Sequence, residues 1–159
     1  MSTARQNVLL VIPAGKEPWR AIAGAIDLAR RRNGGLVALA VIDPNVSIYA
    51  ASSLTDVGFM GEEVGDQVSE AIVREYRTCA EALLHVVAEH AKKEGVVVTP
   101  IIEQGDIGES CRRVIRTYQV GTAVLVAEKR SWLRRFLSHS AGVPLPALAD
   151  CEVHVMEED

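Results

Sequence analysis

Continuous apolar runs, separated by helical patterns or by irregular polar segments, dominate this sequence. Runs without alternation are typical of strands buried on both faces of a sheet. Five segments are expected as strands: Val8–Ile12, Leu36–Ile42, Val96–Ile102, Val120–Ala127 and Cys151–Met156. The last one alternates apolar with polar residues, which indicates a strand with one wetter face.

A first helix is predicted directly after the first strand. Pro18 suits the first helical position, and Asn33–Gly34–Gly35 ends the helix. Arg30–Arg32 fall in its last turn, where positive charge suits the helix dipole. Its expected apolar stripe is Trp19, Ile22, Ala23, Ile26 and Ala29.

Two further helices are predicted, at Val68–Glu94 and Ile107–Tyr118. The first should bury Ile72, Cys79, Leu83, Val86, Val87 and either His90 or Ala91; the second should bury Cys111, Val114 and Ile115. The segment Asn45–Gln67, rich in Gly and Ser, is expected to be a mobile loop that holds at most a short helix.

This order of elements predicts an α/β fold, a doubly wound five-stranded parallel sheet with strand order 3-2-1-4-5 and helices on both faces. Pro100 places the third strand at an edge, because proline cannot donate to a ladder. The 159 residues suit one domain, 1–159, with its core at about 7–156. Ligands of such sheets bind beyond the carboxyl ends of the strands, here at Pro13–Gly15, Ile42–Pro44, Glu103–Asp106 and Ala127–Arg130.

Composition and charge narrow the function classes. The net charge of −4 gives no reason to expect nucleic acid or anionic lipid as a partner. Met1–Gln6 has no apolar segment typical of a signal peptide, and Phe136–Ala149 holds Ser, His, Gly and Pro, so no membrane insertion is expected. Three widely spaced cysteines are not a disulfide framework, which favours reduced thiols and a cytoplasmic protein.

Four segments resemble the universal stress protein family in order and spacing. They are Val8–Pro18 at the first strand and loop, Val41–Pro44, Gly105–Asp106 before a helix, and Ala149–Val153 at the entry to the last strand. The resemblance runs from about Asn7 to Met156. It implies a stress-response protein that dimerises through its last strand, with Cys151, Val153 and Val155 at the interface.

The resemblance also implies a nucleotide site, at positions Ala14, Gly15, Ile42, Gly105, Ala127, Arg130 and Ser140. ATP-binding members carry Asp where this chain has Ala14, and G-x2-G-x9-G-[ST] after the fourth strand. Glycines there let backbone N–H groups approach phosphates closely. Here Ala127 and Ser140 are 13 residues apart where the motif needs 14, and all three glycines are missing.

The helix after that loop departs as well, because Pro144 and Pro146 interrupt it and displace its N-terminus from Ser140. The sequence therefore favours a non-enzymatic homodimer that works through protein contacts and has no cofactor. The alternative is an ATP- or AMP-binding regulatory module that holds its ligand by Arg130, Arg134 and Ser140. A companion to a transporter or kinase is a third possibility.

Other chemistry has weaker support. No G-x-S-x-G, G-x-x-x-x-G-K-[ST] or G-x-G-x-x-G motif is present, so no catalytic residue is expected. His85 and His90 diverge by about 140° on a helix and cannot share a metal. Cys111 is expected to be a buried structural thiol, and Cys79 and Cys151 are expected in the core. Trp132 and Phe136 favour loop anchoring over an adenine stack.

Overall fold

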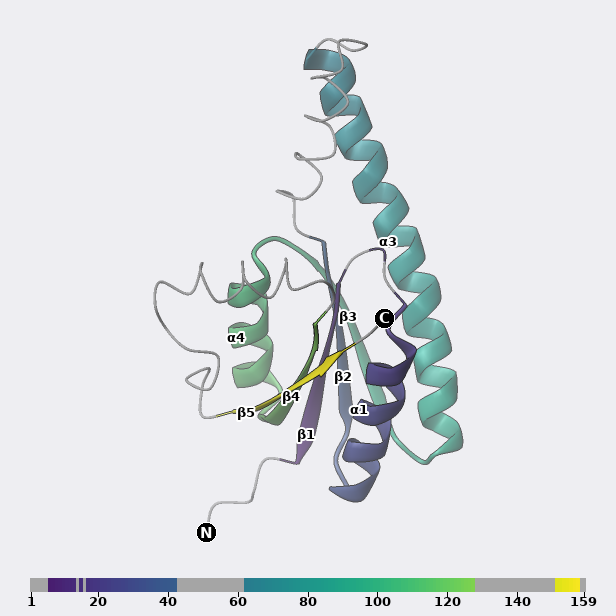
Figure 1. Cartoon of the computed structure of the whole chain (residues 1–159), viewed down its shortest axis with the longest axis vertical. Helices are drawn as coiled ribbons and strands as arrows, with labels where there is room; N and C mark the ends of the chain where they lie inside the picture. The colour runs from purple at the N-terminus through teal and green to yellow at the C-terminus, as the bar shows by residue number, and fades with distance from the viewer. Residues whose placement is uncertain (1–5, 14, 16, 43–61, 128–150, 158–159) are drawn as a thin grey trace.

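The computed structural model describes residues 6–13, 15, 17–42, 62–127 and 151–157 (Figure 1). The elements, in chain order, are β1 (Asn7–Pro13), α1 (Trp19–Arg31), β2 (Leu36–Ile42), α3 (Glu62–Lys93), β3 (Val98–Gln104), α4 (Ile107–Thr117), β4 (Val120–Ala127) and β5 (Glu152–Glu157). The predicted loop Asn45–Gln67 lies outside the described residues up to residue 61, and from Glu62 onward it is helical.

The strands form one parallel sheet in the order β3-β2-β1-β4-β5, which confirms the predicted fold class and strand order. β3 lies at an edge, as Pro100 predicted, and Pro100 pairs in register with Ala38 of β2. β3 begins two residues later than the sequence indicated: Glu94 and Gly95 form the turn after α3, and Val96 and Val97 lie between that turn and the strand.

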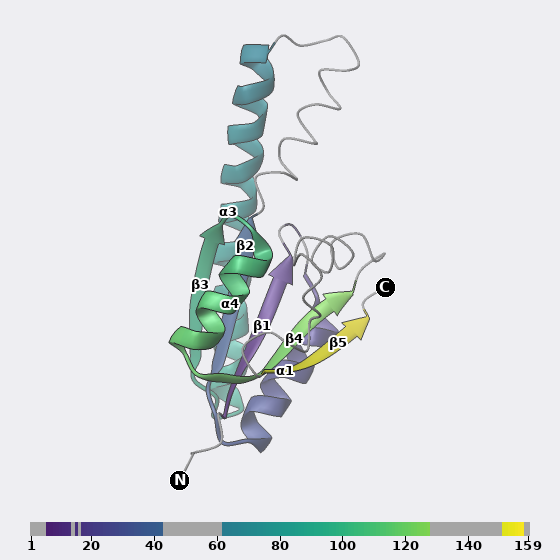
Figure 2. The same cartoon turned by 90° about the vertical axis from the view of Figure 1, so that its left-hand side faces the viewer.

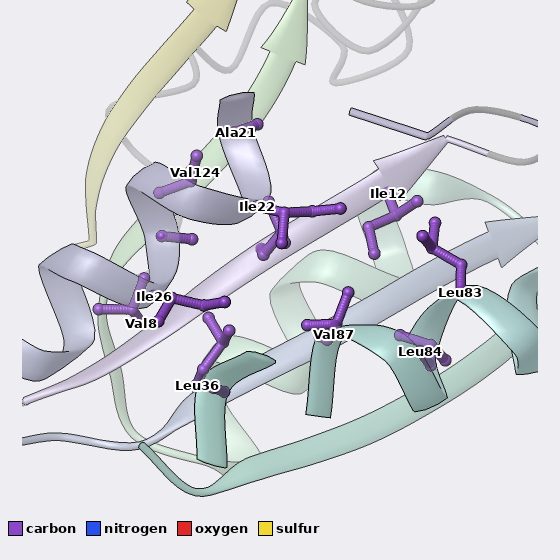
Figure 3. Close-up of a cluster of buried hydrophobic side chains, with 14 of the residues drawn as sticks. Val8, Ile12, Ala21, Ile22, Ile26, Leu36, Leu83, Leu84, Val87 and Val124 are labelled. Carbon is purple, nitrogen blue, oxygen red and sulfur yellow. The ribbon is translucent and has the colours of Figure 1, made fainter. Parts of the chain in front are cut away.

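Helices cover both faces of the sheet. α1 and α3 lie on one face and α4 lies on the other (Figures 1 and 2). In β1, Val8, Leu10 and Ile12 pack toward α1 and α3, where they meet Ile22, Ile26, Leu83 and Val87 (Figure 3). Leu9 and Val11 pack toward α4. The period of two along an unbroken apolar run therefore supplies two separate cores.

The predicted apolar faces of α1 and α3 are confirmed at six positions and wrong at four; the confirmed positions are Ile22, Ile26, Ala29, Leu83, Val87 and Ala91. In α1, Trp19 is 41% exposed and Ala23 is exposed, while Ala21 and Ala25 are buried instead. In α3, Cys79 and Val86 are exposed, Ala91 is the buried member of the pair His90 and Ala91, and Ala80 and Leu84 lie in the buried stripe. The buried stripes therefore combine small and large residues.

α3 is longer than its core-facing stripe. Its 32 residues span about 48 Å at 1.5 Å per residue. Its N-terminal half extends past the carboxyl edge of the sheet (Figures 1 and 2). The sequence pattern predicts a start at Val68, six residues later than the structure shows, because Gly65 resembles a loop residue.

Asn7 ties the opposite, amino-terminal edge together. Its side-chain oxygen accepts a hydrogen bond from Gly35 N at 3.0 Å, and its amide nitrogen donates to the Tyr118 carbonyl at 2.7 Å. Gly34 must be glycine there, because a Cβ would lie 2.0 Å from the Gln6 carbonyl oxygen. The turns before β2 and β4 are thereby fixed against the start of β1.

Two valines give a matched test of the core. Val11→Ala removes two methyl groups from a fully buried site and should lower the free energy of unfolding by about 2 kcal/mol. Val97→Ala makes the same change at a side chain 77% exposed and should stay within about 0.5 kcal/mol of the parent. Urea denaturation measures both, and equal losses in the two variants would contradict the burial of β1.

Candidate functional site

A cavity of about 310 Å³ opens at the carboxyl ends of β1 and β2, beside α3. The strand ends and the following loop contribute Ile12, Pro13, Gly15, Glu17, Ala40 and Ile42, and α3 contributes Cys79, Ala80 and Leu83. Two positions that the sequence singled out, Gly15 and Ile42, therefore share this cavity. Its location beyond the carboxyl ends of parallel strands is where ligands of such sheets bind.

Gly15 lets the loop after β1 pass close to α3. Its φ is 77°, a left-handed conformation that favours glycine, and a Cβ there would lie 3.0 Å from Cε1 of Tyr76. The Tyr76 ring therefore packs directly against this loop. A substitution at Gly15 would be strained in its backbone and would displace the ring.

Gly105 joins the same edge through the backbone. Its N–H donates to the Ile42 carbonyl at 3.0 Å, and its φ of 151° again favours glycine. Asp106 then caps α4, accepting a hydrogen bond from Glu109 N at 3.0 Å. The Gly105–Asp106 pair thus ends β3, begins α4 and fixes the end of β2.

The remaining predicted nucleotide positions divide into two groups. Ala127 is the last residue of β4, and it pairs in register with Glu157 of β5. Ala14, Arg130 and Ser140 lie outside the described residues, as do the other basic, aromatic and hydroxyl residues singled out between 129 and 140. The structure therefore brings Gly15, Ile42 and Gly105 together and describes the backbone of Ala127.

Two polar residues are among the described residues that line the cavity. They are the Glu17 carboxylate and the Cys79 thiol, and the Cys79 Sγ donates to Oε1 of Glu75 at 3.7 Å. Partial loss of hydration, followed by the nearby carboxylates of Glu75 and Glu17, raises the pKa of the Cys79 thiol. Among the described residues, the negative charges at this wall are those of Glu17 in the lining and Glu75 beside the thiol, and carboxylates favour positive over negative groups.

The three cysteines differ in reactivity. All are free, but only Cys79 is exposed, so its assignment to the core was wrong; it lies one position from the buried Ala80 on α3. Cys111 is buried as predicted, and burial raises the pKa of its thiol to about 12. Cys151 is buried as predicted. Within the described residues, no group of three or more His, Cys, Asp or Glu side chains could hold a metal ion.

β5 forms the second edge of the sheet. Cys151, just before it, is buried in this chain's own core beneath α4, Val153 is half-buried against that core, and Val155 is 44% exposed. Of the three predicted interface residues, Val155 presents the most apolar surface to a partner. The Cys151 side chain is engaged inside the chain.

The polar residues of β5 are bound to the rest of the fold. Glu152 pairs with Arg32 at 3.1 Å and with His154 at 3.2 Å, and Arg32 also donates to the Thr122 hydroxyl. The hydrogen bond from Arg32, followed by that from His154, lowers the pKa of the Glu152 carboxyl. These contacts hold β5 against β4 and the end of α1.

No helix among the described residues is both long and apolar enough to cross a membrane.

Comparison with known proteins identifies a protein family that matches most of this chain. The model of the universal stress protein family matches residues 4–157. A solved member of that family from Burkholderia pseudomallei has a TM-score of 0.63 at 18% identity, over 98% of this chain and 98% of that one. UspA from Lactobacillus plantarum has a TM-score of 0.62 at 18% identity, over 97% of this chain and 99% of that one.

A third similar structure is that of a universal stress protein in complex with cAMP. Its TM-score is 0.56 at 15% identity, over 99% of this chain and 100% of that one. At such identities these structures establish a shared fold. The search of curated proteins gave no match.

Alkylation of the native protein by iodoacetamide tests the cysteine assignments. Cys79 should react first and should be the main labelled site, because Cys111 and Cys151 are buried. Its rate at neutral pH should be below that of a free thiol and should rise toward alkaline pH, because its raised pKa keeps the thiolate scarce.

Glu75→Gln should speed this alkylation at neutral pH, since it removes a carboxylate that opposes the thiolate. Glu89→Gln, an exposed change on the same helix, is the matched control and should leave the rate unchanged. Mass spectrometry of the labelled peptides gives both results. Preferential labelling of Cys111, or no effect of Glu75→Gln, would contradict the described geometry.

Proposed function

The chain belongs to the universal stress protein family, and on that premise we propose that it is a cytoplasmic, non-enzymatic stress-response protein that acts as a homodimer through protein contacts and does not bind ATP in the family's manner. The observation that carries the second part is the lining of the carboxyl-end cavity. Its described polar side chains are Glu17 and Cys79, with Glu75 beside the thiol.

That lining is unfavourable for a nucleotide. Phosphate groups are bound by Lys, Arg or clustered backbone N–H groups, and carboxylates repel them. The sequence adds Ala14 in place of the Asp that binding members carry, and Ala127 in place of the first glycine of the phosphate loop. The methyl group of Ala14 cannot accept the hydrogen bond that the Asp accepts from the ligand. The methyl group of Ala127 obstructs the close approach of phosphate to the backbone that glycine allows.

The edge position of β5 supports a dimer. An edge strand presents unpaired backbone N–H and C=O groups, which invite pairing with a second chain. Val155 and the half-buried Val153 add apolar surface at the same strand. Pairing of β5 with its copy about a twofold axis would satisfy the backbone groups and cover both valines.

A binding role is also supported over a catalytic one. An activated nucleophile needs a lowered pKa or an adjacent base. The one exposed thiol has a raised pKa, and Cys111 is buried. A role in protein contact therefore accounts for the chemistry of the described residues. No catalytic reaction is needed to explain them.

A second candidate, a nucleotide-binding regulatory module, keeps one specific observation in its favour. Gly15, Ile42 and Gly105 lie at one edge of the sheet, and the Ile42 carbonyl and Gly105 N–H are hydrogen-bonded there. A similar structure was solved in complex with cAMP. In this candidate Arg130, Arg134 and Ser140 would hold the phosphates.

Light scattering coupled to size exclusion tests the dimer. The protein should elute at twice the chain mass at micromolar concentration, and Val155→Lys should shift it to monomer, because a charge would be buried at the pairing edge. Val97→Lys, an exposed valine distant from β5, is the matched control and should remain dimeric. A parent protein that is monomeric throughout would refute this part of the proposal.

Thermal unfolding with and without ATP and Mg²⁺ tests the nucleotide. No change in the melting temperature is expected, and denaturing the purified protein should release no nucleotide. Ligand that binds only the native state raises the melting temperature by mass action. A clear rise that disappears in Arg130→Ala would favour the second candidate over the first.

A further inference from the structure

The carboxyl-end cavity has the chemistry of a ligand site in its own right. Its walls are the apolar side chains of Ile12, Pro13, Ala40, Ile42 and Leu83, together with Ala80. Ligand pockets in proteins combine such walls with a small number of polar groups that fix orientation. The described polar groups here are one carboxylate, Glu17, and one thiol, Cys79.

The volume sets the size of the ligand. An apolar protein cavity of roughly 150 Å³ is large enough for benzene. The present cavity, at about 310 Å³, is about twice that size. A body of about two fused rings, or an aliphatic group of the same bulk, therefore fills it.

The charges of the side chains at the cavity indicate which polar group its ligand carries. Glu17 lies in the cavity lining, and Glu75 contacts the Cys79 thiol at the same wall. Two carboxylates beside an apolar cavity attract a cation and repel an anion. We propose that this cavity binds a compact amine, with its apolar body between β1, β2 and α3 and its ammonium group paired with the Glu17 carboxylate.

The state of Cys79 agrees with this field. Partial loss of hydration, followed by the carboxylates of Glu75 and Glu17, raises the pKa of this thiol, and the two carboxylates contribute a negative local potential at the cavity wall. Alkylation of the Cys79 thiol can also report ligand binding, because this thiol lines the cavity and is exposed. A ligand seated there covers Cys79 and slows its alkylation.

This site is separate from the proposed dimer edge. None of the described lining residues belongs to β5, so the amine site as described does not depend on whether the protein is a dimer. The amine proposal does rest on the same cavity lining as the proposed lack of ATP binding, so titration with ATP tests both, whereas mass measurement tests the dimer alone and titration with tryptamine tests the amine site alone.

Two probes with one ring system and opposite charge test the proposal. Tryptamine carries an ammonium group on an indole, and indole-3-propionate carries a carboxylate. Tryptamine should slow the alkylation of Cys79 in a saturable manner and should give binding heat by calorimetry. Indole-3-propionate should bind at least about tenfold more weakly, because its carboxylate cannot form the charge-assisted hydrogen bond with Glu17 and is repelled by it.

Variants assign the effect to the cavity. Glu17→Gln, at an exposed position that need not unfold the protein, should weaken tryptamine about tenfold and narrow the gap between the probes. Glu89→Gln is exposed and outside the lining, and it should change neither probe's affinity. Ala80→Leu should weaken both probes by filling the cavity, and its melting temperature checks that it folds.

Four results would overturn the assignment. They are equal binding of the two probes, no protection of Cys79 by tryptamine, tryptamine binding that Glu17→Gln leaves unchanged, and stronger protection by ATP or cAMP than by tryptamine. The cavity could instead prefer indole-3-propionate, and this preference could disappear in Lys16→Gln. That result would overturn the proposal and show that the cavity binds an anion.

Discussion

The burial of β1 on both faces is the constraint on which the rest of the structure depends. Five consecutive residues, Val8 to Ile12, are almost fully removed from water, alternately toward α1 with α3 and toward α4. A strand buried on both sides must have neighbours on both edges and helices on both faces. β2 and β4 supply the edges, and the sheet order follows from this central position.

The two ends of β1 then serve different purposes. At the amino end, Asn7 and the closely approached Gly34 fix the turns before β2 and β4. At the carboxyl end, Gly15 in a left-handed conformation turns the chain under Tyr76 and leaves a cavity between β1, β2 and α3. The contacts at the amino end fix the neighbouring turns, and the cavity lies at the carboxyl end, where ligands of doubly wound sheets bind.

Much of the fold could be predicted from the sequence because two-sided strands give unbroken apolar runs, as in Leu36–Ile42, and because Pro100 permits only an edge strand. Helix faces were harder. An amphipathic helix with many alanines gives several stripes of similar hydrophobicity, so Cys79 was placed in the core while Ala80 occupies it. The site residues Gly15 and Ile42 followed from their position after strands, but Glu17 and Leu83 were not among them, because only the packing of α3 brings them to one cavity.

The central claim is that the universal stress protein fold of this chain carries a carboxyl-end site unsuited to ATP. Amide spectra of glycine-labelled protein, titrated with ATP and Mg²⁺, test it most directly, because Gly15 and Gly105 report on the two sides of that edge. Both resonances should keep their positions up to millimolar nucleotide. Saturable shifts at both glycines would contradict it.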